Sequence, residues 1–378
     1  FIASSPALSA ASVSVPLNLG TPQDKLYSRF VLAVFDGTKF IKVSQPHYIT
    51  NPELIAKNQT PFNDPLTKKG LVIEIDMLSD AFDLGVKHVT TNIAFSQIMG
   101  TGIDYQYDGK TYHFNKGVVD AYDKTISALS NKGMTVTVIL LNDWNPNTPD
   151  LVYPGTQKNS NAFYYMFNAE TEAGFDQTKA IASFLAQHYS GDNPNYGKVS
   201  NWIIGNEINN QAIWNYTGPM PLEQYVEIYE RMFRVMYTSI RSENANARVY
   251  FSTDYNWVQP NGDTSYGARD LIDCFNNQIK KGGQIDWNLA YHPYPLNLQE
   301  PEFWLEDARV TDSVDSPVVN FKNLHVLTDY FTRPELLNSQ GQVRHIILSE
   351  QGFTSQSPSR GNVEKEQAAA FCLCLLPC

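Results

Sequence analysis

Residues 201–207 read NWIIGNE, a short strand-like run that ends in Gly-Asn-Glu. Its apolar residues are adjacent rather than alternating, which is typical of a strand covered on both faces, as in a parallel sheet. A carboxylate at the end of a buried strand is unfavourable unless it contacts solvent or pairs with another polar group. This one stretch therefore indicates both a fold class and a site.

Runs of the same kind recur along the chain and alternate with longer segments of helical period. We predict strands near 30–35, 88–94, 135–141, 201–206, 248–253, 286–292 and 344–349. We predict helices near 75–85, 116–132, 175–189, 221–241, 268–281, 321–332 and 363–376. This alternation predicts an α/β fold with a parallel sheet, and the number of units favours a (β/α)8 barrel of the TIM type.

The connections differ in length at the two ends of the predicted strands. Those that follow strands include the long segments 142–174, 254–267 and 293–320, whereas those that follow helices are short. Long loops at one end are typical of the carboxyl face of a barrel, where active sites lie. The alternative is a doubly wound open sheet, which usually has a phosphate-binding glycine turn after its first strand; residues 35–39 read FDGTK, with a single glycine.

We divide the chain into an N-terminal extension, residues 1–24, and one barrel domain, residues 25–378. The segment after Glu350, residues 351–378, has room for one loop and one helix. We therefore expect the barrel to lack its eighth strand and helix at the carboxyl end, unless residues 13–17 fill the gap. A missing strand leaves two sheet edges unpaired, which predicts self-association through the incomplete edge of the barrel.

Composition argues against several classes of protein. Of the 378 residues, 42% are hydrophobic and 18% are charged, which predicts an ordered chain with a large core. The net charge of -11 argues against a nucleic-acid partner. No stretch approaches the roughly 18 apolar residues of a membrane helix, so we expect no membrane partner. A start at Phe1, few lysines and 21 Tyr favour a secreted or periplasmic protein.

Two glutamates stand where a predicted strand ends and its loop begins. Glu207 follows the fourth predicted strand, and Glu350 follows the seventh in the string SEQGF. In a closed ring of strands both ends face one crevice, so the two carboxylates can meet although they are far apart in sequence. For either residue alone, a helix cap or a buried ion pair with Arg is an equally good interpretation.

At these positions the sequence resembles clan A of the glycoside hydrolases, the retaining (β/α)8-barrel glycosidases. Members of the clan end strand four with an Asn-Glu pair, matched here by Asn206 and Glu207, and strand seven with a Glu, matched by Glu350. The string His292-Pro293-Tyr294 resembles the His-x-Tyr that follows strand six in many members. The resemblance extends over roughly residues 25–370 and assigns no single family within the clan.

The resemblance implies a role for each matched residue. Glu350 would be the nucleophile, and Glu207 would be the general acid and then the base for the attacking water. Asn206 would bind the sugar 2-hydroxyl, Tyr294 would keep Glu350 ionised, and His292 would belong to the substrate-binding set. Glycosidic cleavage needs one protonated and one ionised carboxyl group, roughly 5–5.5 Å apart in retaining enzymes. No cofactor or metal is required, and the expected partner is a polysaccharide or oligosaccharide substrate.

Saccharide sites also need apolar platforms, because the C–H faces of sugar rings stack on aromatic rings. Trp144, Trp214 and Trp257 lie in the predicted strand-end loops, with Asn142 beside the first of them. We expect these four residues to contact sugar, and the alternative for the tryptophans is packing within long loops.

Two other functions remain open from the sequence. One is a catalytically inactive barrel that binds carbohydrate, which the short carboxyl end favours and the two glutamates oppose. The other is a metal-assisted hydrolase that uses His292 with Asp254 or Asp143. No His-x-His or His-Glu-x-x-His string supports a metal site.

Overall fold

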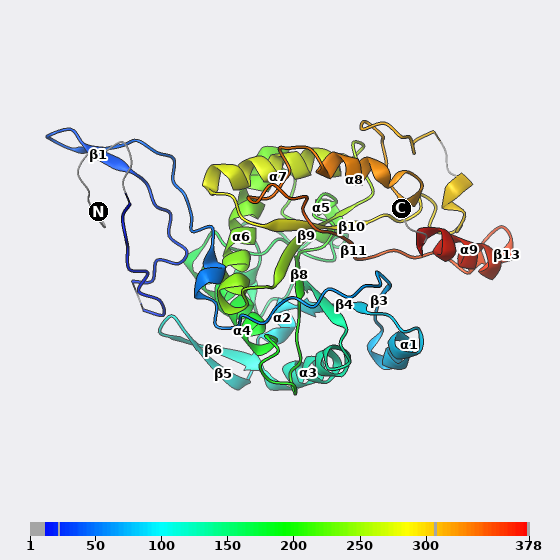
Figure 1. Ribbon diagram of the computed structural model, residues 1–378, viewed down its shortest axis with the longest axis horizontal. Helices are drawn as coiled ribbons and strands as arrows, with labels where there is room; N and C mark the ends of the chain where they lie inside the picture. The colour runs from blue at the N-terminus through cyan, green and yellow to red at the C-terminus, as the bar shows by residue number, and fades with distance from the viewer. Residues whose placement is uncertain (1–11, 22, 306–307, 376–378) are drawn as a thin grey trace.

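The computed structural model describes residues 12–21, 23–305 and 308–375. Its centre is a sheet of seven parallel strands, ordered along the sheet as they follow in the chain (Figure 1). These are β3 (Gly70–Val72), β4 (His88–Ala94), β7 (Thr135–Leu141), β8 (Asn201–Ile204), β9 (Arg248–Asp254), β10 (Trp287–His292) and β11 (Ile346–Leu348). The sheet curls into most of a barrel, which confirms the predicted fold class with seven strands in the described part of the chain.

Helices follow the strands and cover the outer face of the sheet (Figure 1). Every predicted helical range contains one: α1 (Leu78–Asp83), α3 (Lys116–Ser130), α4 (Glu172–His188), α6 (Leu222–Glu243), α7 (Ala268–Gly282), α8 (His325–Phe331) and α9 (Glu364–Leu375). Two one-turn helices, α2 (Phe95–Ile98) and α5 (Gln211–Trp214), lie in strand-end loops. None of the helices in the described ranges is long and apolar enough to cross a membrane.

The two faces of the sheet bury separate apolar clusters. Outward side chains of the strands, such as Val138, Trp202 and Leu289, pack against the helices in the main core. The inward neighbours of these residues fill the barrel interior, in a small cluster of Ile139, Leu141, Ile203, Tyr250 and Ala290. This alternation within continuous apolar runs is what a sheet covered on both faces requires.

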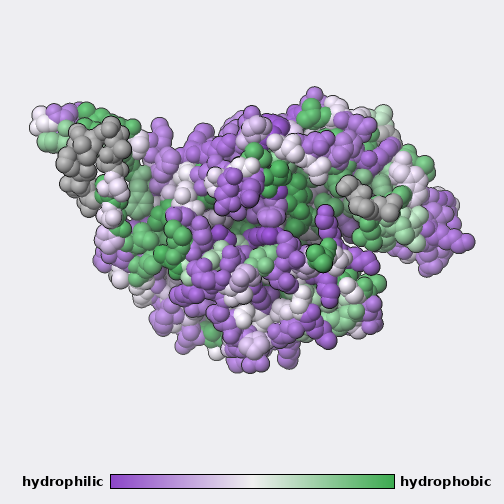
Figure 2. All heavy atoms as spheres, viewed as in Figure 1, coloured by the Kyte–Doolittle hydropathy of each residue, from purple (hydrophilic) through white to green (hydrophobic). Residues whose placement is uncertain are grey.

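The predicted barrel strand near 30–35 is wrong. There, β1 (Ala33–Phe35) pairs with β2 (Phe40–Lys42) in an antiparallel hairpin that extends away from the rest of the molecule (Figure 1). Apolar side chains in this segment are exposed, Leu32 by 63% and Phe35 by 56%. Figure 2 shows hydrophobic surface at its upper left, where this hairpin extends. Apolar composition alone cannot distinguish a buried strand from an exposed one.

The first strand of the sheet is instead β3, which pairs in parallel with β4. The sequence does not predict this strand, because its apolar run is short and is followed closely by charged residues. Since one strand replaces another in the count, Glu207 still follows the fourth strand and Glu350 the seventh. Residues 13–17 form no strand, so they do not fill the gap in the sheet.

Two further hairpins were not predicted. β5 (Gly102–Tyr107) and β6 (Lys110–Asn115) form the longer one, and β12 (Gln356–Ser357) pairs with β13 (Gly361–Asn362) after Glu350. In the described part of the chain, β3 and β11 each have a sheet neighbour on one side only. Self-association through these edges stays a prediction.

A buried arginine anchors β11, the edge strand that leads to Glu350. Arg344 is 2% exposed and donates hydrogen bonds to the carbonyl oxygens of Leu336 at 2.8 Å and Trp287 at 2.8 Å. Its guanidinium lies 4.1 Å from the centre of the Trp287 indole. Burial lowers the pKa of Arg344 to about 10, so the group stays charged at neutral pH.

We expect Arg344→Leu to destabilise the protein by about 2–4 kcal/mol, because buried carbonyl oxygens lose a charged donor. The midpoint of thermal unfolding should fall accordingly. Arg333→Leu is the matched control, since Arg333 is 39% exposed and its carboxylate partners lie at 3.6 and 3.9 Å. That control should cost less than about 1 kcal/mol. Equal effects of the two changes would contradict an anchoring role for Arg344.

Candidate active site

Period two along the strands brings polar residues to the inner mouth of the barrel. Ala290 points into the barrel interior, and so does the next residue but one, His292. On β9 the inward Tyr250 is followed in the same way by Ser252 and Asp254. Side chains that alternate across a strand share a face at every second position. Along each of these strands, the inward side chains therefore change from apolar to polar within two to four residues.

Glu207 is held in an uncommon backbone conformation just after β8. Its φ angle is +36°, and Gly205 two residues earlier has φ +75°. The Glu207 amide donates to the Ser252 hydroxyl oxygen at 2.7 Å, which fixes this turn to the neighbouring strand. A non-glycine residue in the left-handed region costs on the order of 1–3 kcal/mol and persists where the surroundings enforce it.

His292 lies between the two glutamates. Its Nδ1 atom is 2.9 Å from Glu207 Oε1 and 3.8 Å from Glu350 Oε2. The two carboxylate oxygens therefore lie no farther apart than these two distances added together. The His292 ring is fully buried, whereas the side chains of Glu207 and Glu350 are 11% and 23% exposed. The structure thus brings both carboxylates to one partly accessible place.

The opposite ring nitrogen of His292 is also bonded. His292 Nε2 lies 2.9 Å from the Ser349 hydroxyl oxygen, so both nitrogens have partners inside the protein. Burial disfavours the charged imidazole, but the hydrogen bond to Glu207 and the charges of Glu350, Glu207 and Asp254 outweigh burial and raise the pKa of His292. The ring is therefore biased towards the imidazolium form.

Two neighbours oppose the effect of burial on Glu350. Burial is the largest cause that raises the pKa of Glu350, and the charge of Glu207 acts in the same direction. The positive charge of His292 and a hydrogen bond from Tyr294 act against it. Burial, followed by the charges of both glutamates, raises the pKa of the Tyr294 hydroxyl, which therefore stays protonated and able to donate.

A third carboxylate, Asp254, lies beside this pair. Its Oδ1 atom accepts hydrogen bonds from Asn209 Nδ2 at 2.5 Å and from the Asn256 amide at 2.9 Å. Burial first, and then the charge of Glu207, raise the pKa of Asp254 to about 6. The hydrogen bonds from Asn209 and Asn256 fix the orientation of the Asp254 carboxylate at the barrel mouth.

The predicted amide residues are placed differently. Asn206 is 6% exposed, and its Oδ1 atom is buried without a hydrogen-bond partner. Asn142 is 1% exposed and donates to the carbonyl oxygens of Leu151 and Met166 at 2.8 and 3.3 Å. The Asn142 Oδ1 atom, like that of Asn206, is buried without a hydrogen-bond partner. The sugar contact of Asn142 stays a prediction.

The three predicted tryptophans differ in burial. Trp257 is fully buried, donates from its indole nitrogen to the Val314 oxygen at 2.9 Å and packs against Tyr330. These contacts are those of the alternative, packing within a long loop, and its sugar contact stays untested. Trp144 and Trp214 are half-buried in strand-end loops. Their sugar contacts stay a prediction. Neighbouring residues give no sequence signal that Trp257 points inward from its loop.

His292 contacts Glu207 and Glu350, and its predicted place in the substrate-binding set stays a prediction. Sequence reasoning missed Ser349 and Ser252, although both could be found from the period-two pattern that already predicts the inward face. In the described ranges, no group of three or more His, Cys, Asp or Glu side chains could hold a metal ion.

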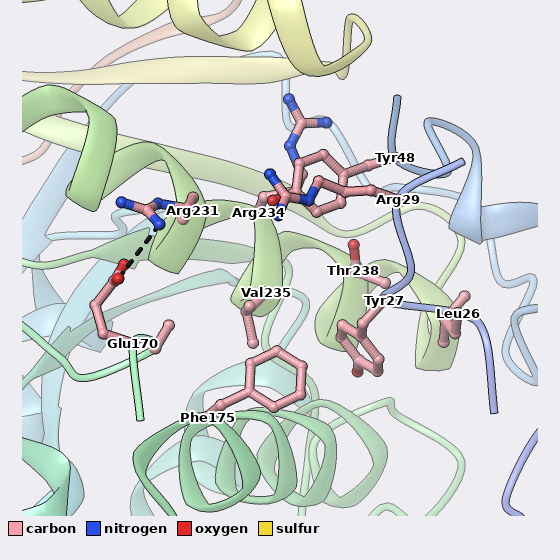
Figure 3. Close-up of a pocket in the computed structure, with 11 residues that line it drawn as sticks. Leu26, Tyr27, Arg29, Tyr48, Glu170, Phe175, Arg231, Arg234, Val235 and Thr238 are labelled. Carbon is pink, nitrogen blue, oxygen red and sulfur yellow. Dashed lines mark ion pairs between the residues drawn. The ribbon is translucent and has the colours of Figure 1, made fainter. Parts of the chain in front are cut away.

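A separate pocket of about 230 Å³ lies between the N-terminal segment and helix α6 (Figure 3). It is lined by Tyr27, Arg29, Tyr48 and Arg231, among others, and Arg231 is paired with Glu170 at 3.3 Å. None of its lining residues belongs to the mouth described above. The candidate site is therefore defined by the carboxylates and their hydrogen bonds, and not by this pocket.

Residues 61–376 match the family described as "Family of unknown function (DUF5722)". The chain belongs to this family. No curated protein matches the sequence.

Solved structures of two glycoside hydrolases are similar to this family member. The family 1 β-glucosidase from Thermotoga maritima in complex with isofagomine lactam is 14% identical, with a TM-score of 0.48, over 78% of this chain and 70% of that one. The endoglucanase Cel5A from the hyperthermophilic Thermotoga maritima is 12% identical, with a TM-score of 0.42, over 84% and 83%. The strand order of the chain itself carries the fold assignment.

The raised pKa of Glu350 predicts that this residue reduces stability. The unfolded chain releases the proton at the ordinary glutamate pKa of about 4.3, whereas the folded protein retains it to higher pH, so stability falls as pH rises across that interval. We expect Glu350→Gln to raise the midpoint of thermal unfolding at pH 7 by about 1–3 °C. The gain should vanish as pH falls to about 4.

The matched control is Glu335→Gln, at a side chain that is 63% exposed. That change should leave the midpoint nearly unaltered. A lower midpoint for Glu350→Gln at pH 7 would contradict the assignment of an unfavourable buried charge.

Proposed function

We propose that this protein is a retaining glycoside hydrolase that cleaves O-glycosidic bonds in a polysaccharide or oligosaccharide. The observation that carries the proposal is the contact of one buried imidazole, His292, with both Glu207 and Glu350. Two close carboxyl groups at the mouth of a barrel are the groups that glycoside cleavage by double displacement needs.

In the first step, an oxygen of ionised Glu350 attacks the anomeric carbon. The bond from that carbon to the leaving oxygen breaks, and the leaving oxygen takes a proton from Glu207. Tyr294 donates to Glu350 and so favours its ionised form before attack. Asn206 is assigned to the sugar 2-hydroxyl because it forms, with Glu207, the Asn-Glu pair at the end of the fourth strand.

In the second step, water attacks the anomeric carbon of the glycosyl ester. Glu207, now ionised, accepts a proton from this water, and the ester bond to Glu350 breaks. The sugar leaves with its original anomeric configuration, because two inversions restore it. His292 acts through the two glutamates: its Nδ1 atom keeps Glu207 in place, and its charge favours the ionised form of Glu350 before attack.

The alternative is a catalytically inactive barrel that binds carbohydrate. The uncommon backbone at Glu207 and the two polar partners of the pair, His292 and Tyr294, favour the enzyme, because a binding module has no need to hold two acids close together. Secretion and degradation of a particular polysaccharide remain part of the proposal.

We expect Glu350→Gln to lower kcat on an activated aryl glycoside by at least about 1,000-fold, because the amide cannot form the glycosyl ester. Affinity for the saccharide should change little, as measured by titration calorimetry with the uncleaved substrate. Product configuration, followed by NMR in the wild type, should be retained. Unchanged hydrolysis in Glu350→Gln, or an inverted product, would refute the assignment.

Glu207→Gln should depend on the leaving group. A dinitrophenyl group leaves without a proton, so the first step should proceed, whereas a sugar leaving group should react at least about 100-fold more slowly than in the wild type. Steady-state kcat/KM with both substrates measures this contrast, because it reports the first step and not the water attack in which Glu207 acts as the base. An equal loss with the two leaving groups would contradict the role of Glu207 as the general acid.

A further inference from the structure

Three aromatic rings form a continuous stack that leads outward from the barrel interior. Tyr164 and Phe163 lie in the 142–174 loop, and Trp214 ends helix α5. The rings of Tyr164 and Trp214 have centroids 6.1 Å apart at 25°, and those of Trp214 and Phe163 are 5.1 Å apart at 21°. Offset, nearly parallel rings at these distances stabilise one another.

The inner end of the stack lies against the apolar cluster inside the barrel. Burial first, and then the charges of Asp143 and Glu350, raise the pKa of the Tyr164 hydroxyl, and its ring packs on the inner cluster of the barrel. The outer end is open, because Phe163 is 64% exposed. Trp214 between them is half-buried. The stack therefore leads from the barrel interior to the surface.

The backbone fixes this arrangement. The amides of Phe163 and Tyr164 both donate to the Ile213 oxygen, at 2.8 and 3.3 Å, and the Tyr216 amide donates to the Tyr164 oxygen at 2.9 Å. These bonds tie the 142–174 loop to helix α5 on both sides of Trp214. A large apolar ring held rigid and exposed beside a polar site is a preformed surface for a ligand, because little entropy is lost on binding.

We propose that Phe163, backed by Trp214 and Tyr164, is a stacking platform for a sugar unit beyond the bond that is cleaved. The substrate is then a chain of linked sugars, and not a glycoside of a single sugar with a small aglycone. This inference rests on the proposed function and deepens it. It identifies Phe163 as a residue that determines preference for chain length, a role for which the sequence gives no motif.

The test compares chain lengths in Phe163→Ala, Phe163→Tyr and the wild type. The probes are β-1,4-linked gluco-, xylo- and manno-oligosaccharides of increasing length and the nitrophenyl glycosides of the same sugars. In Phe163→Ala we expect kcat/KM on the longer chains to fall about tenfold, mainly through KM, with the nitrophenyl glycosides unaffected. Phe163→Tyr keeps the ring face and should behave as the wild type.

Leu54→Ala is the matched control for loss of an exposed apolar side chain, since Leu54 is 74% exposed in the short helix Pro52–Ile55. It should leave all kinetic constants unchanged. Equal chain-length dependence in Phe163→Ala and the wild type would overturn the platform and leave the proposed function standing.

If the wild type cleaves none of these probes, the proposed function fails while the platform is still tested. Affinity electrophoresis through gels that contain hydroxyethylcellulose, xylan or mannan then replaces kinetics. Retardation of the wild type that Phe163→Ala abolishes and Phe163→Tyr keeps would support the platform. Equal retardation of wild type and Phe163→Ala, or none in any gel, would overturn it.

Discussion

The candidate site depends on one buried imidazole between two carboxylates. Like charges at short range raise each other's free energy, and partial burial increases this cost because the surrounding dielectric is low. His292 reduces that cost from within the protein by a hydrogen bond to Glu207 and a positive charge near Glu350. Sheet register fixes the ring: His292 pairs with Asp254 across β9 and β10, and the β10–β11 register that ends at Tyr291 and Leu348 continues to His292 and Ser349. A slip of one residue would turn the imidazole to the helix side of the sheet.

Much of this arrangement could be predicted from the sequence, because apolar runs report burial and the barrel relates strand ends in space. Glu207 and Glu350 were found in this way, and the count of strands that brings them together was right even though residues 30–35 were assigned in place of β3. That error has a physical cause: the hairpin is as apolar as a core strand, and only tertiary packing leaves Leu32 exposed. The burial of Trp257 could not be predicted either, since its loop folds back on α8 through contacts remote in sequence.

The mouth of the barrel concentrates features that oppose stability. Glu207 has a left-handed backbone, Asn206 has an amide oxygen without a donor, and burial disfavours ionised Glu350 and Asp254. Elsewhere the same strands bury continuous apolar runs whose packing follows their sequence pattern. Backbone strain, an unpartnered amide and buried carboxylates thus occur together in a few neighbouring residues. Such a concentration of unfavourable features is typical of functional sites.

The position of Glu350 requires support beyond the sheet, because β11 is paired on one side only in the described part of the chain. Just before this strand, Arg344 donates a hydrogen bond to the carbonyl oxygen of Trp287 in the neighbouring strand β10. After Glu350, Arg360 bonds Glu300 and Glu302 at 2.5 Å each, and the ring of Phe353 stacks on Phe303 at 5.6 Å. Exposed ion pairs contribute little singly, but a paired network combined with aromatic packing fixes a loop more firmly than either does alone. The loop after β10 thus holds the loop after β11, so the strand that carries His292 also leads into the segment that steadies Glu350.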